Sequence, residues 1–208
     1  MQNFFIEFQN FGWNVKTVSA FITVVFTFIQ GYGVFSQSKK IWKKHSVETV
    51  SSYMFIVSFF YFCAFVFYAL DKHSLAMLIN SSLLFFYIPI VVGLFKFKRL
   101  SSSEKLSIPI FVLMIPAMII LPIKDEILTV FLLITGISML DQPLKMAKAE
   151  TRGAVEVKYA VTFLFTAIFW LIFGLAINNW IFIIFNMYAI IIYGSVVFLY
   201  FKPTKLKV

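Results

Sequence analysis

Charged residues are scarce in this sequence. Only 13% of the 208 residues are Asp, Glu, Lys or Arg, whereas 61% are hydrophobic and 20% are aromatic. A soluble domain of this size has too little interior to bury so much apolar surface. The composition therefore predicts an integral membrane protein.

Residues that carry catalytic or metal chemistry are also few. The one cysteine, Cys63, lies in an apolar run and has no partner for an intrachain disulfide. His45 and His73 fall at opposite ends of an apolar run, and the chain shows no pair of catalytic acids at usable spacing and no nucleophile beside a base. We therefore expect no enzyme activity, no metal site and no cofactor.

Long apolar runs are abundant. A bilayer core about 30 Å thick needs roughly 20 helical residues, and seven runs near that length recur, without the alternation of barrel strands. They cover about Thr17–Phe35, Val47–Leu70, Leu75–Phe95, Leu106–Ile123, Ile127–Met146, Val155–Ile177 and Trp180–Phe201. The sequence predicts an all-α membrane protein with seven transmembrane helices.

Basic residues are distributed unevenly over the connections. Fifteen of the 18 follow the first, third and fifth spans or lie in the tail, and the others are Lys16, Lys72 and Lys124. The positive-inside rule then places the N-terminus outside and the C-terminus in the cytoplasm, so that residues 36–46 form a cytoplasmic loop. Cations spread over four membrane-bound segments do not make a nucleic-acid surface. The expected partners are the lipid bilayer and a small solute, and the compact chain favours a bacterial cytoplasmic membrane.

The two halves of the chain resemble each other. A shift of 105 positions aligns them, and one extra residue in the following loop changes the shift to 106. The matched pairs include Gln37 with Gln142, Lys40 with Lys145, Phe65 with Trp170, Asn80 with Asn186 and Tyr87 with Tyr193. Because a fourth crossing restores the direction of the chain, we expect two parallel three-helix repeats, residues 1–104 and 125–208, joined by a linker helix, 105–124. Transporters with parallel repeats bind solute at the repeat interface near mid-membrane.

Two amides are the strongest binding candidates. Asn80 and Asn186 lie in apolar spans at matched positions, and an unsatisfied polar group in hydrocarbon costs several kcal/mol. The alternative is helix–helix adhesion, worth about 0.6 kcal/mol on average. Phe65 and Trp170 precede the amides by 15 and 16 residues, which predicts that both rings lie at a similar depth.

A carboxylate stands inside the fifth predicted span. Asp141 lies roughly 20 Å along it, counted from Ile127 at about 1.5 Å per residue, and a carboxylate at that depth is usually functional. It is a candidate for proton acceptor, cation ligand or hinge. The alternative is a capping residue at a turn before Gln142 and Pro143.

The stretch "SQSKKIWKKHSVETVS" resembles the PQ-loop motif of the SWEET and SemiSWEET transporters, and "DQPLKMAKAETRGAVE" is a looser second copy. This resemblance implies a 3+1+3 helix plan, alternating access, and a pocket lined by a Trp and an Asn from each repeat. Trp170 and Asn186 are similar to that pair, and Phe65 and Asn80 occupy the corresponding places. The prolines that precede Gln in the family are replaced, so the residues implied in hinge motion, gating or proton coupling are Ser36, Gln37, Asp141, Gln142 and Pro143.

The resemblance implies a sugar uniporter. Two alternatives keep the same helix plan. One is a proton-coupled PQ-loop transporter of an amino acid or vitamin-like metabolite, such as the lysosomal cystine exporter, and the other is a membrane receptor similar to the KDEL receptor. The sequence leaves open whether the chain forms a homo-oligomer.

Overall fold

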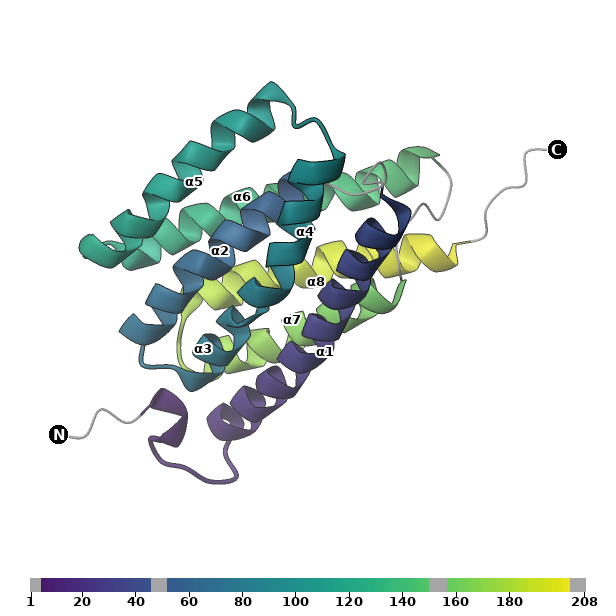
Figure 1. Ribbon diagram of the computed structural model, residues 1–208. Coiled ribbons are helices and arrows are strands. Elements are labelled where there is room, and N and C mark those ends of the chain that lie inside the picture. Colours follow the sequence, from purple (N-terminus) through teal and green to yellow (C-terminus); the bar gives the residue numbers. More distant parts are fainter. Residues whose placement is uncertain (1–4, 46–51, 150–156, 203–208) are drawn as a thin grey trace.

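A computed structural model describes residues 5–45, 52–149 and 157–202 (Figure 1). Within these ranges the elements are a 3₁₀ turn, Ile6–Phe8, and helices α1 (Val15–Lys44), α2 (Ser52–Asp71), α3 (Leu75–Ser81), α4 (Leu83–Phe97), α5 (Ser102–Ile120), α6 (Lys124–Ala149), α7 (Val157–Ala176) and α8 (Trp180–Phe201). Helices α3 and α4 form one continuous span, so the helices make seven passes. The predicted all-α fold is confirmed.

Four of these passes are long and apolar enough to cross a membrane. They are α1, α2, the α3–α4 pair and α8. Helix α7 adds a shorter apolar stretch, Ala160–Ala176, and α5 and α6 are 19 and 26 residues long. The fold is that of an all-α integral membrane protein.

The helices form two groups of three with the same internal order. Helix α4 packs against both α1 and α2, and α8 packs against both α6 and α7. In the described ranges the backbone of α1 does not pack directly against that of α2, nor that of α6 against α7. Between the groups, α1 packs on α7 and α2 packs on α6, while α5 lies at the edge against α2 and α6 (Figure 1). An axis that exchanges α1 with α6 and α2 with α7 maps one of these contacts onto the other.

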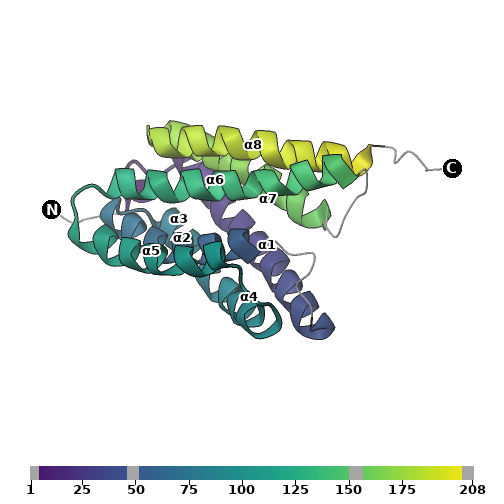
Figure 2. The same ribbon diagram turned by 90° about the horizontal axis from the view of Figure 1, so that it is seen from above.

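The two groups are not parallel along their whole length. Seen from above, the ends of α1 and α4 spread away from the ends of α6 and α8, whereas the opposite ends of the helices stay together (Figure 2). We call the joined end, which carries the α2–α3 and α7–α8 turns, the closed end. The spread end carries the basic residues in the last two turns of α1 and those directly after α4, Lys98 and Arg99.

Both turns at the closed end are built alike. After α2, His73 adopts φ 47° and Ser74 caps α3 by accepting from the Met77 N–H. After α7, Asn178 adopts φ 54° and Asn179 caps α8 by accepting from the Phe182 N–H. The same three backbone hydrogen bonds close each turn, and every donor and acceptor differs by 105 residues between the two: Lys72 to Tyr68, His73 to Leu70 and Ser74 to Ala69 in the first turn, and Ile177 to Phe173, Asn178 to Leu175 and Asn179 to Gly174 in the second.

The shift from 105 to 106 occurs inside the third helices. Since the caps Ser74 and Asn179 are still 105 residues apart, the predicted extra loop residue is wrong. The α3–α4 span instead tightens at Ser82, whose N–H bonds to the Ile79 carbonyl, three residues back. A three-residue 3₁₀ turn rises about 1.5 Å more and rotates about 60° further than α-helix. This turn therefore offsets most of the rise and rotation that the α3–α4 span lacks because it has one residue fewer than α8 between its N-cap and its Asn.

Two predicted boundaries are wrong. The sequence placed a cytoplasmic loop from Ser36, but α1 continues to Lys44. The reason is tertiary: the Trp42 indole donates a 2.9 Å hydrogen bond to the Pro89 carbonyl of α4, and this contact holds the last turns of α1 helical. The alternative for Asp141, a cap at a turn before Gln142 and Pro143, is also wrong, because α6 runs through Pro143 to Ala149.

A glycine in the first helix of each group receives an aromatic ring from the third helix. A Cβ on Gly31 would meet the Phe86 ring at 3.1 Å, and one on Gly136 would meet the Tyr188 ring at 2.7 Å. Tyr188 also donates a 3.0 Å hydrogen bond to the Gly136 carbonyl. Gly31 and Gly136 are 105 residues apart.

We expect Gly136→Ala to lower the melting temperature of the purified protein in detergent. The methyl group displaces Tyr188 and breaks its hydrogen bond, a cost of about 1–3 kcal/mol. Gly194→Ala in α8 is the control, because nothing lies within 4 Å of that position and alanine favours a helix by about 1 kcal/mol. Equal melting temperatures for the two variants would contradict this packing.

Candidate functional site

A cavity of about 80 Å³ lies between the two groups of helices. Its walls come from α1, α2, α3, α4, α6, α7 and α8, and its described lining residues include no Asp, Glu, Lys, Arg or His. Amides, hydroxyls and aromatic rings line it instead. The structure brings three predicted site residues together here, Asn80, Asn186 and Trp170.

Most of the lining residues are matched between the two halves of the chain. Four pairs are 105 residues apart and two are 106 apart: Gln30 with Thr135, Ser58 with Phe163, Tyr61 with Thr166, Phe62 with Ala167, Asn80 with Asn186, and Tyr87 with Tyr193. Both members of four of these pairs are polar. The cavity is therefore lined largely by residues at matched positions of the two halves of the sequence.

The two amides have different partners. The Asn80 amide donates to Thr27 Oγ1 at 2.9 Å and to Gln30 Oε1 at 3.3 Å, so it joins the α3–α4 span to α1. The Asn186 amide donates to the Phe182 carbonyl in its own helix at 2.7 Å. Both side chains are buried. Asn80 thus has a structural role as well as a place at the cavity, whereas the hydrogen bond that Asn186 donates among the described residues stays within α8.

Hydroxyl groups extend the polar lining. Thr135 donates to the Phe131 carbonyl at 2.7 Å, and Thr166 donates to the Thr162 carbonyl at 2.8 Å. Each hydroxyl oxygen keeps lone pairs that can accept a further hydrogen bond. The sequence prediction missed Gln30, Tyr61, Thr135 and Thr166, although the same 105-residue spacing marks them as matched polar pairs in apolar helices.

Aromatic rings pack between the cavity and the closed end. The Trp170 ring lies edge-on to the Phe182 ring at 5.4 Å and to the Phe65 ring at 6.3 Å. Phe65 does not line the cavity but packs behind Trp170, fully buried, against Tyr68. The expected meeting of Phe65 and Trp170 at one depth is observed, but the ring that faces the cavity is Trp170.

Hydrogen bonds and ion pairs join the two groups of helices at the closed end, beyond the rings of Trp170, Phe182 and Phe65. The Asn179 amide donates to the Tyr68 hydroxyl at 3.0 Å, which joins the α7–α8 turn to α2. Lys124 contacts Asp71 at 2.6 Å and Lys72 contacts Asp125 at 2.9 Å, so two ion pairs join α2 to α6. Exposed pairs of this kind contribute roughly 0–1 kcal/mol each.

A polar junction lies at the spread end of the first group. The Lys98 ammonium donates to the Ser52 hydroxyl at 2.7 Å and to the Glu104 carboxylate at 3.0 Å. Burial by itself raises the pKa of Glu104, but hydrogen bonds from Ser101 and Lys98 outweigh it and hold that pKa below its ordinary value. The junction fixes the start of α5 to α2 and α4, within one side of the molecule.

The residues implied in hinge motion lie within helices. Ser36 and Gln37 are half-buried in α1, and Pro143 is buried in α6. The backbone of Asp141 and Gln142 belongs to α6, while their side chains lie outside the described part of the structure. Among the described residues, no three His, Cys, Asp or Glu side chains are grouped to hold a metal ion.

The arrangement defines a known class of helical membrane fold. The chain is similar to the structure of a eukaryotic SWEET transporter solved at 3.7 Å resolution, with a TM-score of 0.64 over 90% of this chain and 97% of that one. Sequence identity is 14%. No protein-family model matches the chain, and no curated protein does. The likeness establishes the fold.

Proposed function

We propose that this protein is a transporter of neutral, hydroxylated solutes, with mono- or disaccharides as the substrate class. The observation that supports this most strongly is the cavity on the axis between two matched groups of helices. The neighbour of the same fold is described as a SWEET transporter. The proposal makes residues 1–104 and 125–208 parallel repeats, with residues 105–124 as the linker.

The chemistry of the cavity favours a neutral solute. A charged solute would need a counter-charge after losing its water, and the described lining offers none. Carboxamides both donate and accept hydrogen bonds, and hydroxyls do the same. Trp170 offers an apolar face to the C–H surface of a sugar ring. This lining disfavours the proton-coupled amino-acid alternative, and Asn80, Asn186 and Trp170 are the proposed binding residues.

The size of the cavity indicates that the solute site changes shape. Small-molecule sites usually enclose about 300–1,000 Å³, whereas this one has about 80 Å³. With one end joined and the other spread (Figure 2), we propose an inward-facing state with a contracted site. Transport then requires the closed end to open as the spread end closes. Pro143 lacks an N–H to bond to the Met139 carbonyl, so α6 can bend there; Ser36 and Gln37 occupy the matching part of α1.

The proposed orientation has the closed end outside and the spread end in the cytoplasm. It rests on the excess of Lys and Arg within and just beyond the C-terminal turns of α1, α4, α6 and α8. A bacterial cytoplasmic membrane is the proposed location. Phe65 supports Trp170 from behind in this proposal.

Uptake by proteoliposomes tests the substrate class. Labelled glucose, sucrose, a neutral amino acid, a cationic amino acid and a vitamin are presented with and without a pH gradient. We expect a sugar to equilibrate across the membrane without accumulating and without an effect of the gradient. Asp141→Asn should behave as wild type.

Two other results would assign a different function. Accumulation of an amino acid that follows the pH gradient and disappears in Asp141→Asn would establish proton coupling through Asp141. Saturable binding of a peptide without flux of any solute would support a receptor and contradict the transport proposal.

A further inference from the structure

Two apolar grooves lie on the outside of the helix groups, away from the axial cavity. One has a volume of about 590 Å³ and lies between the N-terminal segment (residues 5–14), α1 and α3. The other has about 230 Å³ and lies between α6 and α8. Four positions are shared at 105 residues: Val24 with Thr129, Leu75 with Trp180, Ala76 with Ile181, and Ile79 with Ile184. The grooves are therefore equivalent places in the two halves.

The N-terminal segment makes the first groove the larger one. The Glu7 carboxylate is buried and accepts 3.0 Å hydrogen bonds from the N–H groups of Leu75 and Ala76. The Ile6 N–H also donates to the His73 carbonyl at 2.8 Å. These bonds fasten the segment to the start of α3, and Phe8, Phe11 and Trp13 then extend the wall. The second groove has no such segment among its lining residues.

The interior of the first groove is apolar. Its polar groups are already bonded, because Glu7 bonds to the start of α3 and the Thr17 hydroxyl donates to the Glu7 carbonyl at 3.4 Å. Ala20 and Ala76 form a floor of small side chains. The stretch of α1 along the groove, Thr17 to Val24, spans about 10 Å. These dimensions suit a hydrocarbon chain that lies along the helix.

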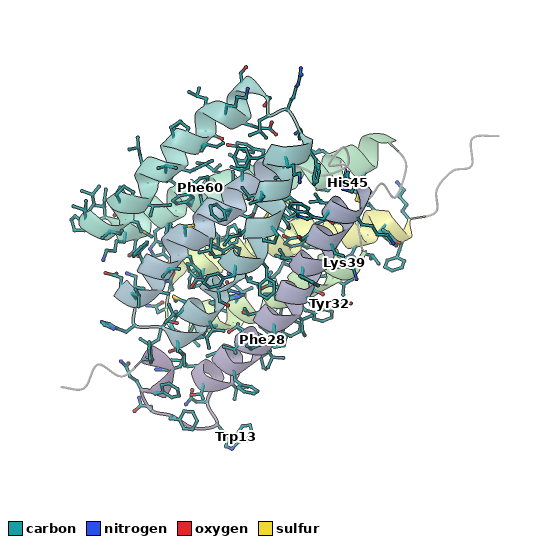
Figure 3. The ribbon with its side chains drawn as sticks, in the orientation of Figure 1. Trp13, Phe28, Tyr32, Lys39, His45 and Phe60 are labelled. Carbon is teal, nitrogen blue, oxygen red and sulfur yellow. The ribbon has the colours of Figure 1, made fainter. Side chains whose placement is uncertain are left out.

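The rim of the groove is suited to the membrane interface. Trp13 is 99% exposed and projects at the end of the molecule, far along α1 from Lys39 and His45 (Figure 3). Phe11 and Phe21 are also exposed. Aromatic side chains collect at the level of lipid headgroups, and Lys16 lies in the first turn of α1, three residues after Trp13 and next to Thr17 of the groove lining. A cation at that level complements the phosphate of a lipid.

We propose that this groove binds one phospholipid, with an acyl chain between α1 and α3 and the phosphate at Lys16. The equivalent groove between α6 and α8 is too small to retain one. The inference depends on the membrane location of the chain and not on its transport activity. A failure to bind lipid would leave the proposed function untouched, and a failure to transport would leave this site untouched.

Native mass spectrometry of the full chain in detergent tests the site. Dioleoylphosphatidylglycerol is added in steps, and we expect one copy to bind well below the concentration at which further copies add. The double variant Val24→Phe/Ile79→Phe fills the groove and should weaken that first binding at least tenfold. The matched double variant Thr129→Phe/Ile184→Phe fills the other groove and should leave it unchanged. Lys16→Gln should weaken it up to about fivefold, the range of an exposed ion pair.

Each result decides the matter. Dioleoylglycerol, which lacks the phosphate, should bind with the affinity of the Lys16→Gln variant for the phospholipid. Where the first double variant does not elute as a folded protein, the milder Ile79→Phe is compared with Ile184→Phe. Equal loss in both grooves, or no first binding step in the wild type, would overturn the proposal.

Discussion

Cross-linking α2 to α6 at the closed end is expected to stop transport completely. In a Cys63→Ser background, Asp71→Cys/Lys124→Cys places two thiols where an ion pair now joins the two groups of helices. A short bis-methanethiosulfonate reagent then joins the two thiols through disulfides and fixes the end that the proposal requires to open. We expect flux to fall to the level of protein-free vesicles and to recover when a reductant cleaves the link.

A cross-link inside one group is the control for that experiment. His45 and Phe97 belong to the ends of α1 and α4 in the first group, and their rings are 5.2 Å apart. Cross-linking His45→Cys/Phe97→Cys should leave flux near the wild-type rate, because α1 and α4 move together. Full activity with the Asp71–Lys124 link in place would show that this end does not open during transport.

Asn186→Ala is expected to produce the largest loss of transport from a single substitution without unfolding the protein. The two hydrogen bonds that a carboxamide offers a solute are together worth about 1–3 kcal/mol, a roughly five- to 150-fold fall in transport efficiency. Stability should change by less than about 1 kcal/mol, because within the described part of the chain the Asn186 amide donates to a carbonyl of its own helix and to no other helix. Sugar flux and melting temperature in detergent measure the two effects.

Asn80→Ala should lower both quantities. Its removal leaves Gln30 Oε1 and Thr27 Oγ1 without the amide that now joins them, and a buried polar group without a partner costs about 1–3 kcal/mol. A lower melting temperature is therefore expected beside the loss of flux. Unchanged transport per folded molecule in both variants would make the two amides structural residues only.

The sequence predicted the number and order of the spans because hydropathy is a local property. It also predicted that Asn80, Asn186 and Trp170 lie together, since residues at matched spacing in the two halves are expected at the same depth. The different bonding of the two amides was not predictable. One cause is that α3 has one residue fewer than α8 between its N-cap and its Asn. The other is that Asn80 bonds to Thr27 and Gln30, which lie 50 or more positions away in the chain.

Long-range contacts also explain the other differences. The extension of α1 to Lys44 depends on the Trp42 contact with α4. The attachment of Glu7 to the start of α3 joins positions 68 residues apart. Neither has a periodic signal in the chain. Phe65 was expected at the cavity wall because it matches Trp170, but the larger indole occupies the cavity side and Phe65 packs behind it.

Distances between spin labels test the central claim, that two groups of helices rock about an axial site. One labelled pair replaces Leu70 and Leu175 at the closed end, and a second pair replaces Phe95 and Phe201 at the spread end; all four side chains are exposed. Pulsed electron–electron double resonance measures both distances in nanodiscs with and without a transported sugar. The account predicts a state in which the closed-end distance lengthens while the spread-end distance shortens. Two distances that stay fixed, or that lengthen together, would contradict it.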